Sequence, residues 1–329
     1  MLTAVLFVII GLALLMFGAD RFVDGAASLA SNLGVPPLLV GLTVVGFATS
    51  APELLVAATA SFAGNPSIAI GNAVGSNIAN IGLVIGVTAL VLPLSVHSRV
   101  LRQEFPIMFG AMLLALFLFW DGALSRLDGG ILALGLVTMM IMTSYLGMKY
   151  SRPPAATADQ GTLTDPESIE EPEFASLSTP KALLLSLVGL ICLVIGSDRL
   201  VAGAVFIATH FGVSDLVIGL TIVAIGTSLP ELAASVASAL KGESDIALGN
   251  VIGSNMFNIL GVTAAPALIA PTLLEPAVLH RDMPIMFGLT IALYIMGFGR
   301  AETVSRVSGA CLLIAFTAYQ FLLYSAATG

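Results

Sequence analysis

The 329-residue chain is 57% hydrophobic and only 10% charged, with a formal net charge of −8 at pH 7. Soluble domains carry about 25% charged residues, so this composition excludes an ordinary soluble protein and predicts an integral membrane protein. No basic cluster suggests nucleic acid, and the two cysteines, Cys192 and Cys311, lie in separate apolar runs, where packing is their expected role.

Apolar runs long enough to cross a bilayer, which takes about 20 residues, recur along the whole chain. We expect ten membrane-spanning helices, at residues 3–19, 36–62, 68–93, 104–120, 128–149, 181–198, 213–240, 246–271, 283–299 and 304–325. The pairs Asp20-Arg21 and Asp198-Arg199 are expected to close the first and sixth helices. The second and third helices of each half carry Gly, Pro, Ser and Asn in mid-span, so we expect these four helices to be broken. The predicted fold is an all-α membrane protein.

The two halves of the chain repeat each other. Glu231 follows Glu53 by 178 positions, and Asn258 follows Asn80 by the same 178. Five helices per half is an odd number, so the halves should enter the bilayer from opposite sides as an inverted repeat, with a site near the midplane. We expect residues 1–150 and 181–329 to be the two five-helix repeats. The acidic segment 151–180 between them has too few apolar residues for a core and is expected to be a flexible linker.

Each half also carries the same two polar motifs inside apolar helices. The first is Thr-Ser-x-Pro-Glu, at residues 49–53 and 227–231. A charge at membrane depth is costly and indicates function, so Glu53 and Glu231 predict an ion site. Each proline frees a main-chain carbonyl four residues earlier, which must find another partner inside a membrane, and a cation is one such partner. A kink with hydroxyls bonded back to the helix would explain Thr-Ser-x-Pro alone, but it does not explain the Glu after both prolines.

The second motif is Gly-Asn-x-x-Gly-Ser-Asn-x-x-Asn, at residues 71–80 and 249–258. Its spacing of four, as between Ser76 and Asn80, places side chains on one helix face. The glycines permit close helix packing, which does not account for the amides. Asn72 and Asn250 are candidates for bonds to the opposing broken helix.

Together the motifs supply carboxylate, hydroxyl, amide and carbonyl oxygens, which suit Ca²⁺ or Na⁺ and do not suit zinc or copper. Two Glu would neutralise one Ca²⁺. Without it, two like charges would face each other in a low dielectric unless Na⁺ or H⁺ entered, which is a physical basis for obligatory exchange.

The Lys and Arg residues indicate the orientation. With the N-terminus outside, nine of the 12 lie on the inner side. We therefore expect an inner-membrane protein with both termini outside and the linker in the cytoplasm. The site favours exchange of Ca²⁺ for Na⁺. The first alternative is exchange of H⁺ for Ca²⁺ or another divalent cation at the same Glu pair, and the other two alternatives are a channel and an intramembrane enzyme. Buried carboxylates on broken, inverted helices favour an alternately exposed site over a channel, and no His-Glu-x-x-His motif supports an enzyme.

These motifs resemble those of the calcium/cation antiporter superfamily, in its bacterial sodium/calcium-exchanger-like branch. The resemblance covers nearly all of the membrane part. It implies ten helices in two inverted repeats, ions bound between helices 2, 3, 7 and 8, and Na⁺/Ca²⁺ exchange by alternating access, with helices 1 and 6 as a sliding gate.

The resemblance also implies roles for particular residues. Glu53 and Glu231 match the calcium-binding carboxylates. Further Ca²⁺ and Na⁺ ligands match the hydroxyls of Thr49, Ser50, Ser76, Thr227, Ser228 and Ser254, carbonyls near Gly46 and Ala224, and the amides of Asn80 and Asn258. Gly75 and Gly253 stand where the proton-coupled branch has Glu, and Asn258 stands where potassium-dependent members have Asp, which favours sodium without potassium. We expect no cofactor, and the ions and the lipid bilayer are the only expected partners.

Overall fold

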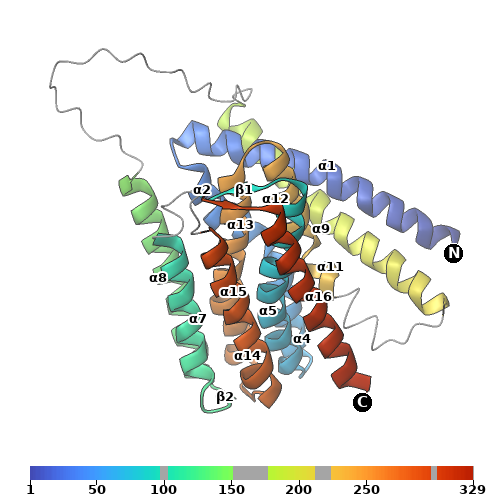
Figure 1. Cartoon of the computed structure of the whole chain (residues 1–329), viewed down its shortest axis with the longest axis vertical. Helices are drawn as coiled ribbons and strands as arrows, with labels where there is room; N and C mark the ends of the chain where they lie inside the picture. Colours follow the sequence, from blue (N-terminus) through green and yellow to red (C-terminus); the bar gives the residue numbers. More distant parts are fainter. Residues whose placement is uncertain (97–102, 151–176, 212–223, 298–301, 329) are drawn as a thin grey trace.

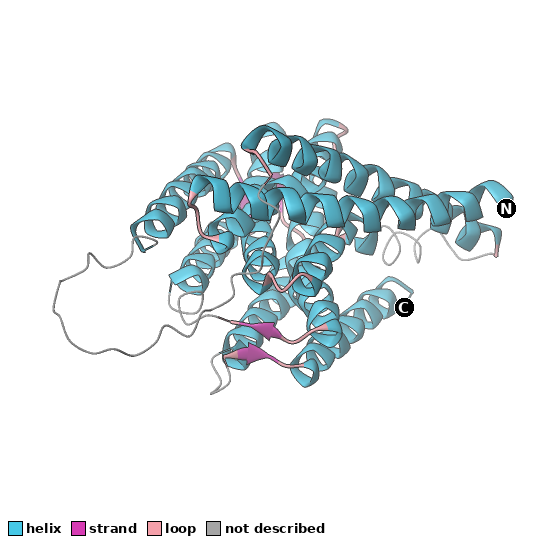
Figure 2. Cartoon of the chain, turned by 90° about the horizontal axis from the view of Figure 1, so that it is seen from above, coloured by secondary structure: helices cyan, strands magenta, loops and turns pink. Residues whose placement is uncertain are grey.

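The computed structural model describes residues 1–96, 103–150, 177–211, 224–297 and 302–328. This part of the chain is a bundle of helices with two short two-stranded ribbons (Figures 1 and 2). Eight helical runs in it are long and apolar enough to cross a membrane, judged by length and composition. Two further apolar helices, α7 (Phe105–Phe119) and α12 (Leu229–Leu240), are shorter. Residues 97–102 and 212–223, which precede these two helices in the sequence, lie outside the described residues, as does most of the expected linker. The count of ten spans therefore stays a prediction.

The elements follow the same order in the two halves, with η marking π-helical segments. The first half contains α1 (Leu2–Leu33), α2 (Pro37–Val40), η1 (Gly41–Val45), α3 (Gly46–Thr49), α4 (Ala51–Phe62), α5 (Pro66–Ala79), η2 (Asn80–Ile85), α6 (Gly86–Val91), β1 (Leu94–Ser95), α7, β2 (Ala123–Leu124) and α8 (Arg126–Tyr150). The second half contains α9 (Thr179–His210), α11 (Ala224–Thr227), α12, α13 (Ser244–Phe257), η5 (Asn258–Val262), α14 (Thr263–Ile269), β3 (Thr272–Leu273), η6 (Val278–Asp282), α15 (Met283–Gly297), β4 (Thr303–Val304) and α16 (Arg306–Thr328).

The predicted ends of the first and sixth helices were wrong. Both helices run 32 residues, straight through the Asp-Arg pairs, and α1 ends only at Gly34, whose φ of 59° is the left-handed cap that glycine adopts easily. A helix of that length spans about 48 Å, more than the ~30 Å of a bilayer core. Figure 1 shows α1 and α9 lying obliquely across the other helices. The charged pairs are tolerated inside the helices because each finds a partner: Lys241 lies 2.6 Å from Asp20, and Arg199 stacks on Phe7.

Glycines at intervals of seven hold α1 and α9 backbone to backbone. Gly11, Gly18 and Gly25 of α1 face Gly196, Gly189 and Ser186 of α9, so the two helices run antiparallel. A Cβ on Gly18 would lie 2.8 Å from the carbonyl oxygen of Gly189, and one on Gly189 would lie 2.7 Å from that of Gly18. Only residues without a side chain permit such an approach.

The second helix of each half is broken at a serine. Ser50 separates α3 from α4, and Ser228 separates α11 from α12, with nearly the same backbone angles (φ −84° and −90°). Pro52 and Pro230 stand in the first turn after each break, where a missing N–H does no harm. The third helix of each half differs from the prediction, because it continues without interruption through a π-helical segment that begins at Asn80 or at Asn258.

The two ribbons join the halves at opposite ends of the bundle. In one, Leu94 of β1 pairs with Val304 of β4; in the other, Ala123 of β2 pairs with Leu273 of β3. Figure 1 shows β1 near the top of the molecule and β2 at the bottom. Between the two ends, the spans that contain α5 and α13 are the most enclosed of the eight, and their polar motifs therefore lie inside the protein.

Candidate ion-binding site

Two carboxylates are buried in the centre of the predicted site. Glu53 in the first turn of α4 and Glu231 in the first turn of α12 are both 0% exposed. None of their four oxygens has a hydrogen-bond partner of good geometry among the described residues, although the Thr49 hydroxyl lies beside the Glu231 carboxylate. The charge of Glu53 also acts on Glu231. Burying an unpaired charge costs several kcal/mol, so each carboxylate needs a cation or a proton to offset its charge.

Hydroxyl and carbonyl oxygens from opposite halves meet next to the carboxylates. The Thr49 hydroxyl at the end of α3 lies 3.2 Å from the Ser254 hydroxyl on α13. Ser254 also lies 3.2 Å from the main-chain oxygen of Gly46, which can accept its proton. Gly46 permits this contact, because a Cβ there would lie 2.9 Å from the main-chain nitrogen of Ser254. The predicted ligands Gly46, Thr49 and Ser254 therefore form one cluster across the repeat boundary.

The two amides at the start of the π-helical segments are buried but differ in their contacts. The Asn80 side-chain nitrogen donates to the side-chain oxygen of Asn255 at 3.1 Å, and the Asn80 side-chain oxygen is left without a donor in the described part of the chain. Both side-chain polar atoms of Asn258 are likewise without a described partner. A buried amide oxygen without a donor is a natural cation ligand.

The serines at the two breaks complete the set. The hydroxyls of Ser50 and Ser228 are buried and have no partner within the described ranges. Ser76 is buried on α5, Thr227 ends α11, and Ala224 begins it. The repeat is the reason to include these last three residues among the predicted ligands.

One of the two main-chain carbonyls that the prolines free has a hydrogen-bond donor within the protein. The Gly226 carbonyl, which Pro230 releases from the helix, accepts a hydrogen bond of 2.6 Å from the Ser197 hydroxyl on α9. The repeat-equivalent residue of Ser197 is Ala19, which has no hydroxyl. The second half therefore satisfies its freed carbonyl with a serine hydroxyl that the first half lacks.

Two residues around the site were missed or only loosely placed by sequence reasoning. Ser235 lies four residues after Glu231, on the same face of α12, and this spacing was the available signal. Its hydroxyl lies 2.9 Å from the side-chain nitrogen of Asn250. Asn250 contacts both broken helices, whereas the side-chain nitrogen of Asn72 has no described partner.

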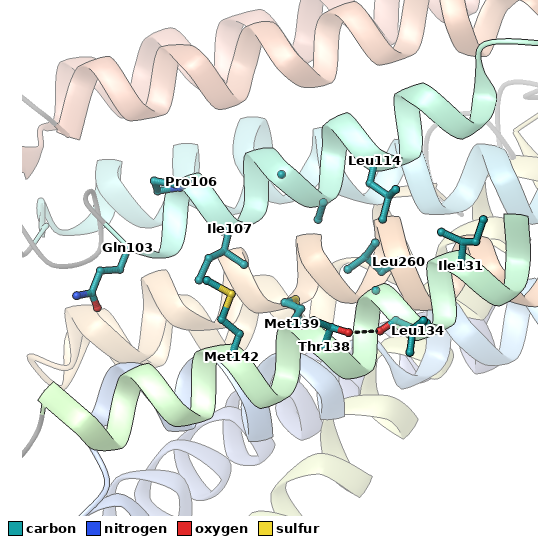
Figure 3. Close-up of a pocket in the computed structure, with 13 residues that line it drawn as sticks. Gln103, Pro106, Ile107, Leu114, Ile131, Leu134, Thr138, Met139, Met142 and Leu260 are labelled. Atoms are coloured by element: carbon teal, nitrogen blue, oxygen red, sulfur yellow. Dashed lines mark hydrogen bonds between the residues drawn. The ribbon is translucent and has the colours of Figure 1, made fainter.

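A separate pocket of about 710 Å³ lies between α7 and α8 and contains none of the candidate ligands (Figure 3). Ile107 of α7 and Met139 and Met142 of α8 point into it, and the Thr138 hydroxyl is bonded back to the Leu134 carbonyl at 2.8 Å. Its lining is almost wholly apolar and has no carboxylate, so it has no chemistry for a hard cation.

The donor set of the buried site is therefore two carboxylates with neutral oxygens around them. The described residues contain no group of three or more His, Cys, Asp and Glu side chains that could hold a metal. Neutral oxygens with few charges suit a hard ion that must bind and leave, because each added carboxylate would hold it more tightly. Apolar helices of spanning length around such an oxygen site define an integral membrane protein of the cation-transporter class.

Comparison with known proteins gives the family. A family profile described as "Sodium/calcium exchanger protein" matches residues 3–145 and 181–325, and the chain belongs to this family of cation antiporters. It is 46% identical to the putative antiporter CaxA of Alkalimonas amylolytica, over 99% of this chain and 100% of that one. It is 40% identical to the inner membrane protein YrbG of Escherichia coli K12, over 98% of both chains. Among solved structures, the sodium-calcium exchanger NCX_Mj soaked with Na⁺ and Sr²⁺ matches with a TM-score of 0.79 and 31% identity, over 96% of this chain and 97% of that one.

Proposed function

We propose that this protein exchanges Ca²⁺ for Na⁺ across the cytoplasmic membrane by alternating access, with Glu53 and Glu231 as the calcium-binding carboxylates. The observation that carries the proposal is the pair of fully buried carboxylates without good hydrogen-bond donors. A divalent cation neutralises both charges at once. Sodium ions take the place of Ca²⁺ at oxygens that the two ions share, including those of Thr49 and Ser254.

The same observation explains why transport is an exchange. When Ca²⁺ leaves, two like charges remain in a site from which water is excluded, and this state is costly. The protein then changes its accessible side only after another cation has entered. A leak of one ion without the other is thereby suppressed.

The two ribbons support an inverted repeat in which the site lies between the halves. Each ribbon pairs a strand of the first half with one of the second, and β1 of the first half corresponds to β3 of the second at the 178 offset. Two such pairings at opposite ends are what a twofold axis in the membrane plane produces. In this proposal α1 and α9 move together along the bundle and open the site to one side at a time.

Orientation follows from the positive charges. Both termini lie outside the cell and the acidic segment 151–180 lies in the cytoplasm, because nine of 12 Lys and Arg residues then lie on the inner side. The similarity to an inner membrane protein of E. coli supports the cytoplasmic membrane as the location.

Transport of ⁴⁵Ca²⁺ into liposomes that contain the purified full-length protein tests the proposal. Vesicles loaded with Na⁺ at symmetric pH should take up Ca²⁺, and vesicles with a pH gradient but no Na⁺ should not. Uptake driven by the pH gradient alone would replace Na⁺ by H⁺ as the coupling ion. No uptake under either condition would refute calcium exchange.

Two Glu→Gln variants test the site. Glu53→Gln should abolish uptake, because one Ca²⁺ then faces a single carboxylate. Glu243→Gln makes the same chemical change in the loop between α12 and α13, outside the site, and should transport normally. Full transport by Glu53→Gln would refute the assignment of the carboxylates.

A further inference from the structure

Asn250 joins the two broken helices through its side chain. It is 0% exposed on α13. Its side-chain oxygen lies 3.0 Å from the Thr49 hydroxyl of α3 in the first half. Its side-chain nitrogen lies 3.2 Å from the main-chain carbonyl of Glu231 and 2.9 Å from the Ser235 hydroxyl, both on α12 in the second half. One amide thus links a neutral candidate ligand of one half to the helix that carries the carboxylate of the other.

The direction of each hydrogen bond in this network follows from the chemistry of its members. A main-chain carbonyl can only accept, so the Asn250 nitrogen must face Glu231 and the Asn250 oxygen must face Thr49. That oxygen can also only accept, as can the main-chain carbonyls of Val45 at 3.1 Å and Gly46 at 3.4 Å, so the Thr49 hydroxyl donates its single proton within this set of acceptors. The lone pairs of the Thr49 oxygen are then free for a cation. The Ser254 proton has the Gly46 carbonyl as an acceptor at 3.2 Å, so it need not point at the ion or occupy a Thr49 lone pair.

The first half cannot build the same network. The offset of 178 residues maps Asn250 onto Asn72 and Ser235 onto Ala57, which has no hydroxyl. In the described structure the side-chain nitrogen of Asn72 is buried and has no hydrogen-bond partner. The two halves therefore differ next to the site. Among the described contacts, only the amide of the second half, Asn250, has three hydrogen-bond partners.

We propose that Asn250, itself held by Ser235, is a positioning residue that ties the Thr49 hydroxyl to the Glu231 helix and so fixes where the Thr49 oxygen meets the bound cation. This rests on the proposed function, since it concerns the same ion site. Without the network, the Thr49 hydroxyl keeps only its bonds to the carbonyls of Val45 and Gly46, and its link to the Glu231 helix is lost. Loss of a single hydrogen bond changes an equilibrium on the order of fivefold.

Equilibrium binding of ⁴⁵Ca²⁺ to the purified full-length protein measures this effect without requiring transport. Ser235→Ala should weaken Ca²⁺ binding about fivefold, because Asn250 loses the contact that fixes its rotamer. Ala57→Ser is the matched control: it exchanges the same two residue types at the equivalent place in the other half, where no network reaches Thr49. It should bind Ca²⁺ as the wild type does.

A double-mutant cycle separates positioning from a general structural role. Thr49→Val removes the hydroxyl that Asn250 is proposed to orient, so adding Ser235→Ala to Thr49→Val should cost no further affinity. Equal affinity of Ser235→Ala and wild type, or a full additional loss in the double variant, would overturn the inference. If the wild type itself bound no Ca²⁺, the proposed function would fail, and the inference with it. The two failures are therefore distinguishable.

Discussion

Replacing Gly189 by alanine should weaken the contact between α1 and α9. A Cβ at this position would lie 2.7 Å from the Gly18 carbonyl oxygen and closer still to the main chain of Phe22. Since these neighbours are backbone, the helices themselves must move apart. Overpacking of this kind costs about 1–3 kcal/mol. Alanine also favours the helix by about 1 kcal/mol relative to glycine, so the change has two opposing parts.

Gly110→Ala measures the favourable part, the gain in helix propensity, by itself. Gly110 lies inside α7, and a Cβ there would meet nothing within 4 Å. Because the helix-propensity gain is common to both variants, the difference between them is the overpacking cost alone. Thermal unfolding in detergent, followed by circular dichroism, should show Gly189→Ala melting below Gly110→Ala. If Gly189→Ala melted as high as Gly110→Ala, the close backbone packing of α1 and α9 would be refuted.

Two further predictions concern charged residues outside the ion site. The Lys241 ammonium lies 2.6 Å from carboxylate oxygens of both Asp20 and Asp24 and so joins α12 to α1; because these groups are partly exposed, Lys241→Met should lose only about 1 kcal/mol of stability. That loss should shrink in 1 M NaCl, and a loss independent of salt would contradict an ionic origin. Burial, with a smaller contribution from Asp245, raises the pKa of Glu243 above its ordinary 4.5. The folded state therefore holds this proton more tightly than the unfolded state, and stability falls as the pH rises from 4.5 through the folded pKa. Glu243→Gln should raise the melting temperature at pH 8 and leave it unchanged at pH 4; an unchanged melting temperature at both would show that the charge is not costly.

Much of the fold could be predicted because the membrane restricts what a chain can do. Apolar runs of spanning length have few alternatives to a helix, and proline directly after Thr-Ser-x predicts a break that the structure has at Ser50 and Ser228. The repeat then located the polar motifs of both halves. The sequence did not reveal that α1 and α9 run past their charged pairs, because the partners that make this tolerable, such as Lys241, are distant in sequence.

The site was harder to predict where the two halves differ. Symmetry reasoning assigns the same role to equivalent residues, yet Ser235 and Ser197 make contacts that Ala57 and Ala19 cannot make. The Ser197 hydroxyl that the freed Gly226 carbonyl accepts from could therefore not be found from the repeat. Hydrogen-bond partners depend on side-chain distances across the bundle, which no motif spacing specifies.

The ribbons and the shared site have a consequence for how the protein is made. During synthesis the first half enters the membrane before the second exists, so β1 and β2 at first have no strand to pair with, and Thr49 has no Asn250 to bond. Glu53 likewise enters the bilayer before the residues that later surround it. The first half is therefore an unfinished intermediate, exposed to quality control until the ribosome has delivered at least β4 near the end of the chain. The two halves should assemble as one cooperative unit, and a truncation that removes β4 and α16 would leave a ribbon open at one end of the bundle.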